Sequence, residues 1–432
     1  MAEKNLKSLL SIGVSLCMLL GMFTVGTMAM EPGDSEETPI FIKSKLDFET
    51  FAQEVNEGES FEGKYVKLSN DIYLNANDSL NGKPITWNPV GFCFLNENNG
   101  KISDNSKSFK GTFDGNGFSI ICNIDEFVKN DGTDKTGAIF GYVGKHGVLK
   151  NLGIRGIISG EKIQASVSAL CDVNCGTLEN CKARATVKGV YGASGLAFIN
   201  CGTIRKCEVN GKILSRDLNC AGICSTNYGE VDSCKVHALL ANCQNGGIAG
   251  DNNYLTPETG GIASFNYGKI TNCFVNSYIS NKNIETLKNY EIYLKQKSDG
   301  KNAYIGCAGG IVSTNNGLIE NCKFTGSVNS YEVGGIVGIN YEIVRSCETD
   351  CHMMGAIIGG IAAQNILGDK DYSGELVLDH QGGYIANCNS KSDIKSLFLM
   401  GDIVCTDYWE DSHATVENCT ASSKVVYLQE TN

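Results

Sequence analysis

Short runs of aliphatic residues alternate with glycine and asparagine along most of this chain, and their order repeats. The clearest copy reads Gly-Gly-Ile-Val-Ser-Thr-Asn-Asn-Gly-Leu-Ile-Glu-Asn-Cys, from Gly309 to Cys322. Each full copy has Asn at its seventh position and an aliphatic residue three positions before Cys. The full copies are 168–181, 194–207, 221–234, 309–322 and 334–347, and looser ones are 137–152, 359–365 with 383–388, and 401–407 with 415–419.

The spacing of the copies selects a class of architecture. Successive copies begin 25 to 27 residues apart wherever no insertion intervenes. A period of this length indicates repeats that stack, because one repeat alone cannot bury its apolar face. The abundance of Ile, Val, Gly and Asn favours short strands over helices, and Gly and Asn suit tight corners. The pattern therefore predicts an all-β fold, a right-handed parallel β-helix of about a dozen rungs.

The repeat also resembles a known family. Gly-Gly-Ile-Val-Gly-x-Asn at Gly334 to Asn340, with Gly-x-Ile-x-Asn-Cys as at Gly317 to Cys322, is similar to the GLUG-type repeat. The resemblance covers roughly residues 63–419. It implies a secreted or surface protein, mostly bacterial, with a pectate-lyase-like β-helix. It implies no catalytic residues, because the repeat positions are scaffold.

The N-terminus has the features of an export signal. Lys4 and Lys7 precede an apolar run from Leu9 to Gly26, and Thr27-Met28-Ala29 has the small residues of a cleavage site. We expect a signal peptide over residues 1–29 and no membrane attachment after its cleavage. The alternative, a membrane anchor, is weakened because the run is at the short end for a span.

Residues 30–62 predict an acidic leader followed by a capping helix. Apolar residues recur at close to helical spacing from Leu46 to Val55, with Ser44 placed to cap the start and Gly58 beyond the end. The first rung of a solenoid has an exposed apolar end, which such a helix can cover. Residues 63–432 then form the β-helix, with loop insertions expected at about 253–266, 274–306, 366–382 and 408–413.

Two repeat positions predict continuous columns inside the solenoid. The seventh position predicts an asparagine ladder of Asn174, Asn200, Asn227, Asn266, Asn315 and Asn340, whose amides bond along the axis. The last position predicts a cysteine ladder of Cys181, Cys207, Cys234, Cys273, Cys322, Cys347, Cys388 and Cys419. Because Leu152 fills that position in the first copy, we expect these cysteines to be buried thiols. Disulfides between rungs and a zinc site at Cys-x3-Cys pairs are the alternatives.

The composition limits which classes of binding partner fit this protein. The net charge of −12 argues against nucleic acid, because phosphate contacts need clustered Lys and Arg. High Gly and low Pro, 51 and 5 of 432 residues, fit strands turned at Gly and Asn corners. We expect a monomer with no cofactor, with calcium at Asp369 and Asp371 as a weaker alternative.

Candidate ligand-binding residues lie where insertions interrupt the repeat. Three insertions are expected to leave one corner, between the Asn and Cys positions, and so to line one edge. Their acidic, aromatic and histidine residues are Tyr254, Glu258, Asp369, Asp371, Tyr372, Glu375, Asp379, His380, Tyr408, Trp409, Glu410, Asp411 and His413. Aromatic rings stack on the apolar faces of sugars, and carboxylates accept sugar hydroxyls. This edge predicts a binding groove for an extended glycan or a glycoprotein.

The expected function is thus that of a secreted or cell-surface binding protein of the adhesin kind. A polysaccharide lyase or glycoside hydrolase is the main alternative, since paired carboxylates or a basic residue assisted by calcium can cleave such chains. The chain lacks the Asn-Thr-Asp, Gly-His-Gly and Arg-Ile-Lys signatures of polygalacturonases, which disfavours catalysis. A structural surface spacer without a ligand is the second alternative.

Overall fold

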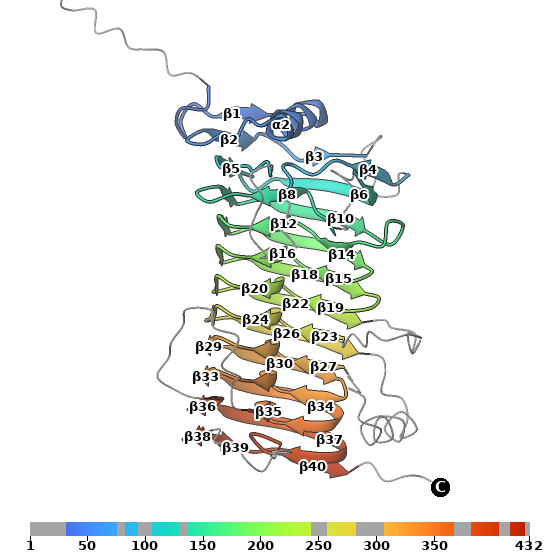
Figure 1. Cartoon of the computed structure of the whole chain (residues 1–432), viewed down its shortest axis with the longest axis vertical. Coiled ribbons are helices and arrows are strands. Elements are labelled where there is room, and N and C mark those ends of the chain that lie inside the picture. Colours follow the sequence, from blue (N-terminus) through green and yellow to red (C-terminus); the bar gives the residue numbers. More distant parts are fainter. Residues whose placement is uncertain are drawn as a thin grey trace, which may run out of the picture.

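The computed structural model describes residues 32–75, 83–93, 106–128, 136–242, 257–281, 306–366, 382–405 and 415–427. Figure 1 shows these residues as one stack of strands whose axis runs the length of the molecule. The expected signal peptide, residues 1–29, lies outside the described residues. No helix in the described ranges is long and apolar enough to cross a membrane.

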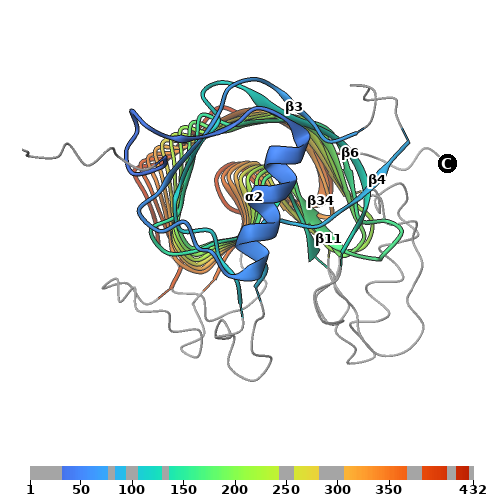
Figure 2. The same cartoon turned by 90° about the horizontal axis from the view of Figure 1, so that it is seen from above.

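The stack begins with the expected capping helix. Helix α2, Lys45–Glu57, starts at Ser44, whose side chain accepts a hydrogen bond from the Asp47 N–H group, and ends at Gly58 with φ of 118°. Its buried face lays Phe48 on the Trp87 ring, with centroids 5.5 Å apart and an interplanar angle of 2°. Viewed down the axis, α2 crosses the end of the stack (Figure 2). The helix therefore covers the apolar end of the first rungs.

Three sheets of parallel strands run along the axis. Sheet A has twelve strands: β1 Ile40–Ile42, β2 Tyr65–Leu68, β5 Thr112–Asp114, β9 Val148–Lys150, β13 Thr177–Glu179, β17 Thr203–Arg205, β21 Glu230–Asp232, β25 Lys269–Thr271, β29 Leu318–Glu320, β33 Ile343–Arg345, β36 Tyr384–Ala386 and β38 Thr415–Glu417. Sheet C has eight: β8 Phe140–Val143, β12 Cys171–Asn174, β16 Ala197–Asn200, β20 Cys224–Asn227, β24 Ala263–Asn266, β28 Val312–Asn315, β32 Val337–Asn340 and β35 Ala362–Asn365.

Sheet B holds the other twenty strands in two neighbouring columns. The long column is β3 Ile72–Tyr73, β4 Ile85–Trp87, β6 Ser119–Phe127, β10 Gly153–Ser159, β14 Lys182–Gly189, β18 Glu208–Ser215, β22 Lys235–Asn242, β26 Phe274–Asn281, β30 Lys323–Asn329, β34 Glu348–Gly359, β37 Asn389–Gly401, β39 Thr420–Ala421 and β40 Lys424–Tyr427. The short column is β7 Thr136–Gly137, β11 Ser166–Ser168, β15 Gly192–Ser194, β19 Asn219–Ala221, β23 Glu258–Gly260, β27 Cys307–Gly309 and β31 Glu332–Gly334.

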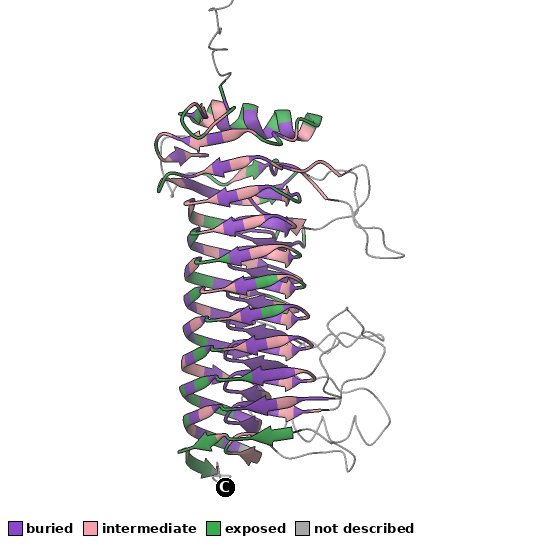
Figure 3. Cartoon of the chain, turned by 90° about the vertical axis from the view of Figure 1, so that its left-hand side faces the viewer, coloured by how far each residue is buried: buried purple, intermediate pink, exposed green. Residues whose placement is uncertain are grey.

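From β8 to β37 each turn of the chain adds one strand to sheet C, one to sheet A and one or two to sheet B, so the molecule is a parallel β-helix and the predicted fold class is confirmed. The repeat register is confirmed at the Ile after Gly-Gly. The Ile311 N–H group donates to the Ile336 carbonyl at 2.9 Å, and Ile336 donates to Ile361 at 2.9 Å. These side chains are fully buried, and the wall is buried inward along its length (Figure 3). Equal repeat positions therefore stack one rung apart.

The asparagine ladder is present and is one member longer than expected. Each Nδ2 donates to the Oδ1 of the next member at 2.8 Å, six times from Asn174 to Asn365. All seven side chains are buried. The amides thus satisfy each other inside the corner between sheets C and A.

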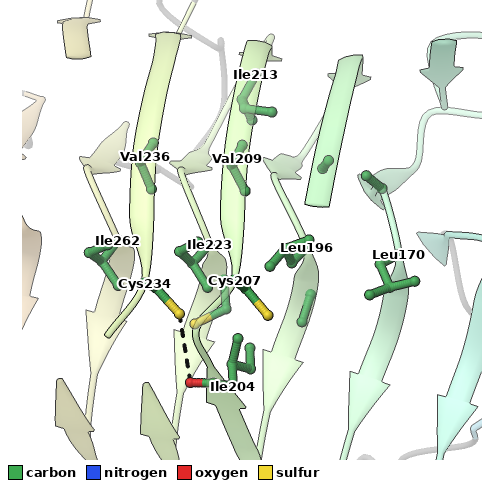
Figure 4. Packing of buried hydrophobic residues seen from close by; sticks show 14 of the residues in the cluster. Leu170, Leu196, Ile204, Cys207, Val209, Ile213, Ile223, Cys234, Val236 and Ile262 are labelled. Atoms are coloured by element: carbon green, nitrogen blue, oxygen red, sulfur yellow. Dashed lines mark hydrogen bonds between the residues drawn. The ribbon is translucent and has the colours of Figure 1, made fainter. Parts of the chain in front are cut away.

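The cysteine ladder is a column of thiols. Its eight members carry no disulfide, and all but Cys419 are buried. Each sulfur reaches a carbonyl of the preceding rung, as Cys234 does with Ile204 at 3.7 Å (Figure 4). Neighbouring side chains are apolar, including Val236 and Ile223, which supports the prediction of small core residues.

The insertions differ from expectation in one rung. Residues 246–252 also read as a copy of the repeat and begin 25 residues after Ala221, but the strands of this rung are β23 and β24, which begin at Glu258 and Ala263. The expected loop over 253–266 is therefore wrong for 258–266. Phe274–Asn281 is likewise strand β26 and not part of a loop. Gly-Gly-Ile-Ala occurs twice in this stretch, and the second copy pairs with β20 and β28.

Candidate functional site

The chain leaves the described stack at two corners, not one. At the first corner, Asn242 and Asn281 end strands of the long column of sheet B, and the described chain resumes at Pro257 and Gly306. At the second, Ile366 and Cys405 follow sheet C positions, and the chain resumes before β36 and β38 of sheet A. The hypothesis that all three insertions share a corner is therefore wrong for the first of them.

Between these two corners lie the short column of sheet B and the strands of sheet C. Figure 2 shows the wall turned inward, toward the axis, beside β11 of the short column. Side chains on the outer face of the two columns touch across this bend. The Glu258 carboxylate of β23 accepts hydrogen bonds from Ser313 and Thr314 of β28, and Gln364 of β35 donates to Glu332 of β31 at 2.8 Å. Outer side chains diverge at a convex corner, so these contacts show that this corner is re-entrant.

In the later rungs glycine occupies the bend, at the position that Ser168, Ser194 and Ala221 take in earlier rungs. The first Gly of each Gly-Gly pair ends a strand of the short column, as Gly309 does in β27. A Cβ added to Gly309 would lie 1.8 Å from the Val312 carbonyl oxygen, and one added to Gly310 would lie 2.1 Å from that of Gly335. No other residue could be placed there without moving the backbone.

The outer face of sheet C carries a column of side chains that are mostly apolar or aromatic. In register, one per rung, they are Tyr142, Val173, Ile199, Thr226, Phe265, Thr314, Ile339 and Gln364. All but Val173 are partly exposed. Four of the partly exposed members, Tyr142, Ile199, Phe265 and Ile339, are apolar or aromatic at positions that Thr226, Thr314 and Gln364 fill with polar side chains in other rungs, so the apolar character of this face is not required by folding.

A second column, the corner column, follows the asparagine ladder on its outer side. Its members are Cys175, Cys201, Tyr228, Tyr267, Asn316, Tyr341 and Ile366, and from Cys201 onward each N–H group donates to the ladder Asn carbonyl of the preceding rung. The rings of Tyr228 and Tyr267 stack with centroids 5.1 Å apart and an interplanar angle of 13°. Tyr228 is nevertheless 57% exposed. The corner column therefore presents aromatic surface at the border of sheets C and A.

Sheet A, on the other side of this corner, has a different outer face. Its charges pair between neighbouring rungs: Arg205 with Glu179 at 2.8 Å, Arg345 with Glu320 at 2.6 Å, and Lys269 with Glu230 at 3.4 Å. Such a surface is solvated and self-compensated. From β13 to β25 the outer positions of sheet A thus carry charged or polar side chains where sheet C and the corner column carry rings.

A pocket of about 240 Å³ lies near the cap and offers less chemistry. Its one deep cation, Lys150, contacts Glu36 at 2.5 Å and Asp114 at 4.0 Å. These opposite charges offset each other across the pocket. The outer face of sheet C is the stronger candidate.

Of the predicted site residues, only Glu258 is described. It was expected in an exposed loop, but it begins strand β23 and is 6% exposed, which corrects that prediction. The other predicted residues lie outside the described residues: Tyr254, Asp369, Asp371, Tyr372, Glu375, Asp379, His380, Tyr408, Trp409, Glu410, Asp411 and His413. Whether they converge stays a prediction.

Sequence reasoning missed the corner column. The signal was available, because Cys175, Cys201, Tyr228 and Tyr267 each follow a ladder Asn directly and precede a Gly. Within the described ranges, no group of three or more His, Cys, Asp or Glu side chains is placed to hold a metal ion.

Comparison with known proteins agrees with this architecture. Residues 305–329 match the family model described as the GLUG motif. The chain carries a GLUG motif. The matched GLUG segment runs from the start of β27 to the end of β30, which is one complete rung. The resemblance noted in the sequence is thereby confirmed.

Other comparisons are more distant. No curated protein matches the chain. Among solved structures, one described as a "putative immunoglobulin A1 protease from Bacteroides ovatus" is similar at 12% identity, with a TM-score of 0.37, over 92% of this chain and 87% of that one. A likeness at this level carries no argument about activity.

Proposed function

We propose that this GLUG-repeat β-helix is an exported binding protein of the adhesin kind, and that it holds a glycan or glycoprotein chain against sheet C. The observation that supports this proposal is the continuous row of partly exposed aromatic and aliphatic side chains along the outer face of sheet C, together with the stacked Tyr228 and Tyr267 of the corner column. Neighbouring sheet A carries paired charges instead. The ligand is a linear chain of pyranose units.

The arrangement suits such a ligand for two physical reasons. Aromatic rings contact the apolar faces of pyranoses, and polar side chains nearby accept or donate to the hydroxyls. Phe265 and Tyr267 supply rings, and Thr226 and Thr314 supply hydroxyls from the rungs on either side. The same positions recur at about 4.8 Å per rung, close to the rise of one sugar unit, so an extended polymer meets repeated contacts.

The test compares two exposed tyrosines on different faces. The full chain without residues 1–29 is screened on a glycan array, with and without calcium, and the best glycan is then titrated by calorimetry. We expect Tyr228→Ala to weaken binding about tenfold, near the loss of one aromatic contact. Tyr278→Ala, which removes a 51% exposed tyrosine from the long column of sheet B, should leave affinity unchanged.

Two results would overturn the proposal. One is an array with no glycan bound under either condition, which favours the spacer alternative. The other is equal loss of affinity in Tyr228→Ala and Tyr278→Ala, which places the ligand elsewhere. Neither substitution removes a buried side chain, so thermal unfolding of both proteins should match the parent.

A further inference from the structure

Two cysteines occupy the corner column and not the core. Cys175 and Cys201 each follow a ladder asparagine, and because Asn174 pairs with Asn200, they lie on neighbouring rungs in register. Cys175 is half-buried and Cys201 is exposed, whereas seven of the eight ladder cysteines are buried. Solvent therefore reaches this pair of thiols.

The two thiols hydrogen-bond to each other, so that one sulfur can act as a nucleophile while the other keeps its proton. The Cys201 thiol donates to the Cys175 sulfur, and this is the main reason that the pKa of Cys175 is lowered to about 7. The Tyr142 phenol of β8 also donates to Cys175, against the opposing effect of burial. The same contact raises the pKa of the Cys201 thiol, so Cys201 keeps the proton. At neutral pH, Cys175 carries the thiolate that attacks electrophiles.

The ladder cysteines differ from this pair in their access to solvent, although thiols of neighbouring rungs also hydrogen-bond there and lower the pKa of Cys388 to about 4. Their sulfurs are buried and contact backbone carbonyls, as Cys273 does with Val231 and Thr271. Burial raises the pKa of thiols such as Cys234, Cys273 and Cys347. They serve as internal controls for the exposed pair, because they share its spacing between rungs without its access.

We propose that Cys175 and Cys201 form a redox-active dithiol that reacts with small-molecule disulfides and closes to a disulfide between neighbouring rungs. In the first step the Cys175 thiolate attacks one sulfur of the small disulfide, whose S–S bond breaks and releases one thiolate. Cys201 then loses its proton to water and attacks the Cys175 sulfur, which displaces the second small thiolate. The two cysteines are oxidised by two electrons, and the small disulfide is reduced to two thiols.

The backbone geometry is compatible with this closure. Neighbouring parallel strands lie about 4.8 Å apart, and the Cα atoms of disulfide-bonded cysteines lie about 4.4–6.8 Å apart. The pair also sits in a corner turn, where side chains do not interlock with core neighbours. Closure there leaves the asparagine and cysteine ladders in place.

The experiment uses oxidised glutathione as the probe. The full chain is treated with it at pH 7, remaining thiols are alkylated, and each cysteine is located by peptide mass spectrometry. We expect a Cys175–Cys201 cross-link that dithiothreitol reverses, with Cys347 and Cys388 still thiols. In Cys201→Ala the cross-link should be replaced by glutathione on Cys175, because the attacking thiol is then absent.

A second measurement separates reactivity from mere exposure. With a pKa of about 7, half of Cys175 is thiolate at pH 7, against about one part in a hundred at an ordinary value of 9.0. Alkylation of Cys175 should therefore slow in Cys201→Ala, by up to about fiftyfold, and more modestly in Tyr142→Phe. Cys93→Ser, which removes a third thiol close to the pair, should change neither the cross-link nor this rate.

Three outcomes would overturn the inference. Glutathione on both cysteines without a cross-link would show that the sulfurs cannot meet. A cross-link from either cysteine to Cys93 would show that Cys175 and Cys201 are not the two thiols that pair. Equal alkylation rates in parent and Cys201→Ala would show that the Cys201 thiol does not activate Cys175.

Discussion

The asparagine ladder and the cysteine ladder each place the same residue type at one fixed position of successive rungs, yet their side chains connect the rungs differently. Asparagine side chains bond to each other at 2.8 Å from Asn174 to Asn365. Cysteine sulfurs contact backbone groups of the preceding rung: carbonyls at 3.4 Å from Cys181 and 4.0 Å from Cys388, and N–H groups, as Cys207 accepts from Cys181 at 3.4 Å. Leu152 takes the cysteine position in an earlier rung, where it is also buried. Val143 takes the asparagine position in that same rung and is buried too, so it is the bonding between amides from Asn174 to Asn365, and not the corner itself, that requires asparagine.

The difference follows from what burial does to each group. A buried amide has donors and an acceptor whose loss of water must be replaced by hydrogen bonds. A thiol is a weak donor and acceptor, so its burial is favourable without a partner. Substitutions in the two ladders should therefore differ in size.

The largest effect should come from the middle of the asparagine ladder. Asn266→Leu removes the bonds to Asn227 and Asn315 and leaves one polar atom of each without its ladder partner. We expect the free energy of unfolding to fall by about 2–4 kcal/mol, the cost of buried polar groups that lose partners. Urea denaturation followed by circular dichroism measures it.

The matched control is Asn316, which directly follows Asn315, the ladder member of the next rung. Asn316→Ala removes a half-buried amide from the corner column and should cost less than about 0.5 kcal/mol. Comparable losses in both variants would mean that the ladder bonds add no stability of their own.

A smaller effect is expected in the cysteine ladder. Cys273→Ala removes one buried sulfur and leaves a small cavity, which should cost about 1 kcal/mol. Cys273→Val should recover most of that loss, because the position tolerates an apolar residue of similar size. If Val destabilised the protein as much as Asn266→Leu does, the two ladders would be equally specific and the comparison would fail.

The smallest effect should come from the outer face of sheet A. The hydrogen bond from the Arg205 guanidinium lowers the pKa of the Glu179 carboxyl below its ordinary value of 4.5. A lowered folded pKa gives stability that is present above the ordinary value and is lost as the pH falls below it. Glu179→Gln should thus cost less than about 1 kcal/mol at pH 7 and less still in acid.

Urea midpoints for parent and Glu179→Gln across this pH range test the sign. The difference between the two proteins should shrink as Glu179 becomes protonated in the parent. A difference that grows in acid would contradict the assignment of the ion pair.

Much of the fold could be predicted because the repeat consists of residue types, such as Gly and Asn, that suit only a few backbone conformations. Gly-Gly before Ile311 and Ile336, and Asn at the corner, predict the register of most rungs correctly. The helix start at Ser44 and its end at Gly58 followed from capping chemistry.

The rung of β23 could not be placed from sequence alone. Its repeat motif occurs twice, at 246–252 and again from Gly260, and the first copy has the expected spacing. Only pairing across sheet C distinguishes them, since Ala263 pairs with both Cys224 and Val312. Local sequence does not contain that information.

The candidate site was less predictable for a related reason. The insertions carry the obvious acidic and aromatic residues, whereas the described aromatic surface lies on repeat positions such as Phe265 and Tyr267. A residue just outside a structural ladder is marked in the sequence only by its place between the ladder Asn and the next Gly, and not by a packing requirement. The inward bend, which brings Glu258 to Ser313, also depends on contacts between different rungs.

The asparagine ladder also has an electrical direction. In all six bonds the donor belongs to the earlier rung and the acceptor to the later one, so the amide dipoles add along the axis instead of alternating as strand dipoles do. Each aligned amide polarises the next, and such chains strengthen cooperatively. An interior member such as Asn266 should thus be held more tightly than Asn174 or Asn365 at the ends. Because of this polarisation, the hydrogen bonds of the ladder are not equal in strength.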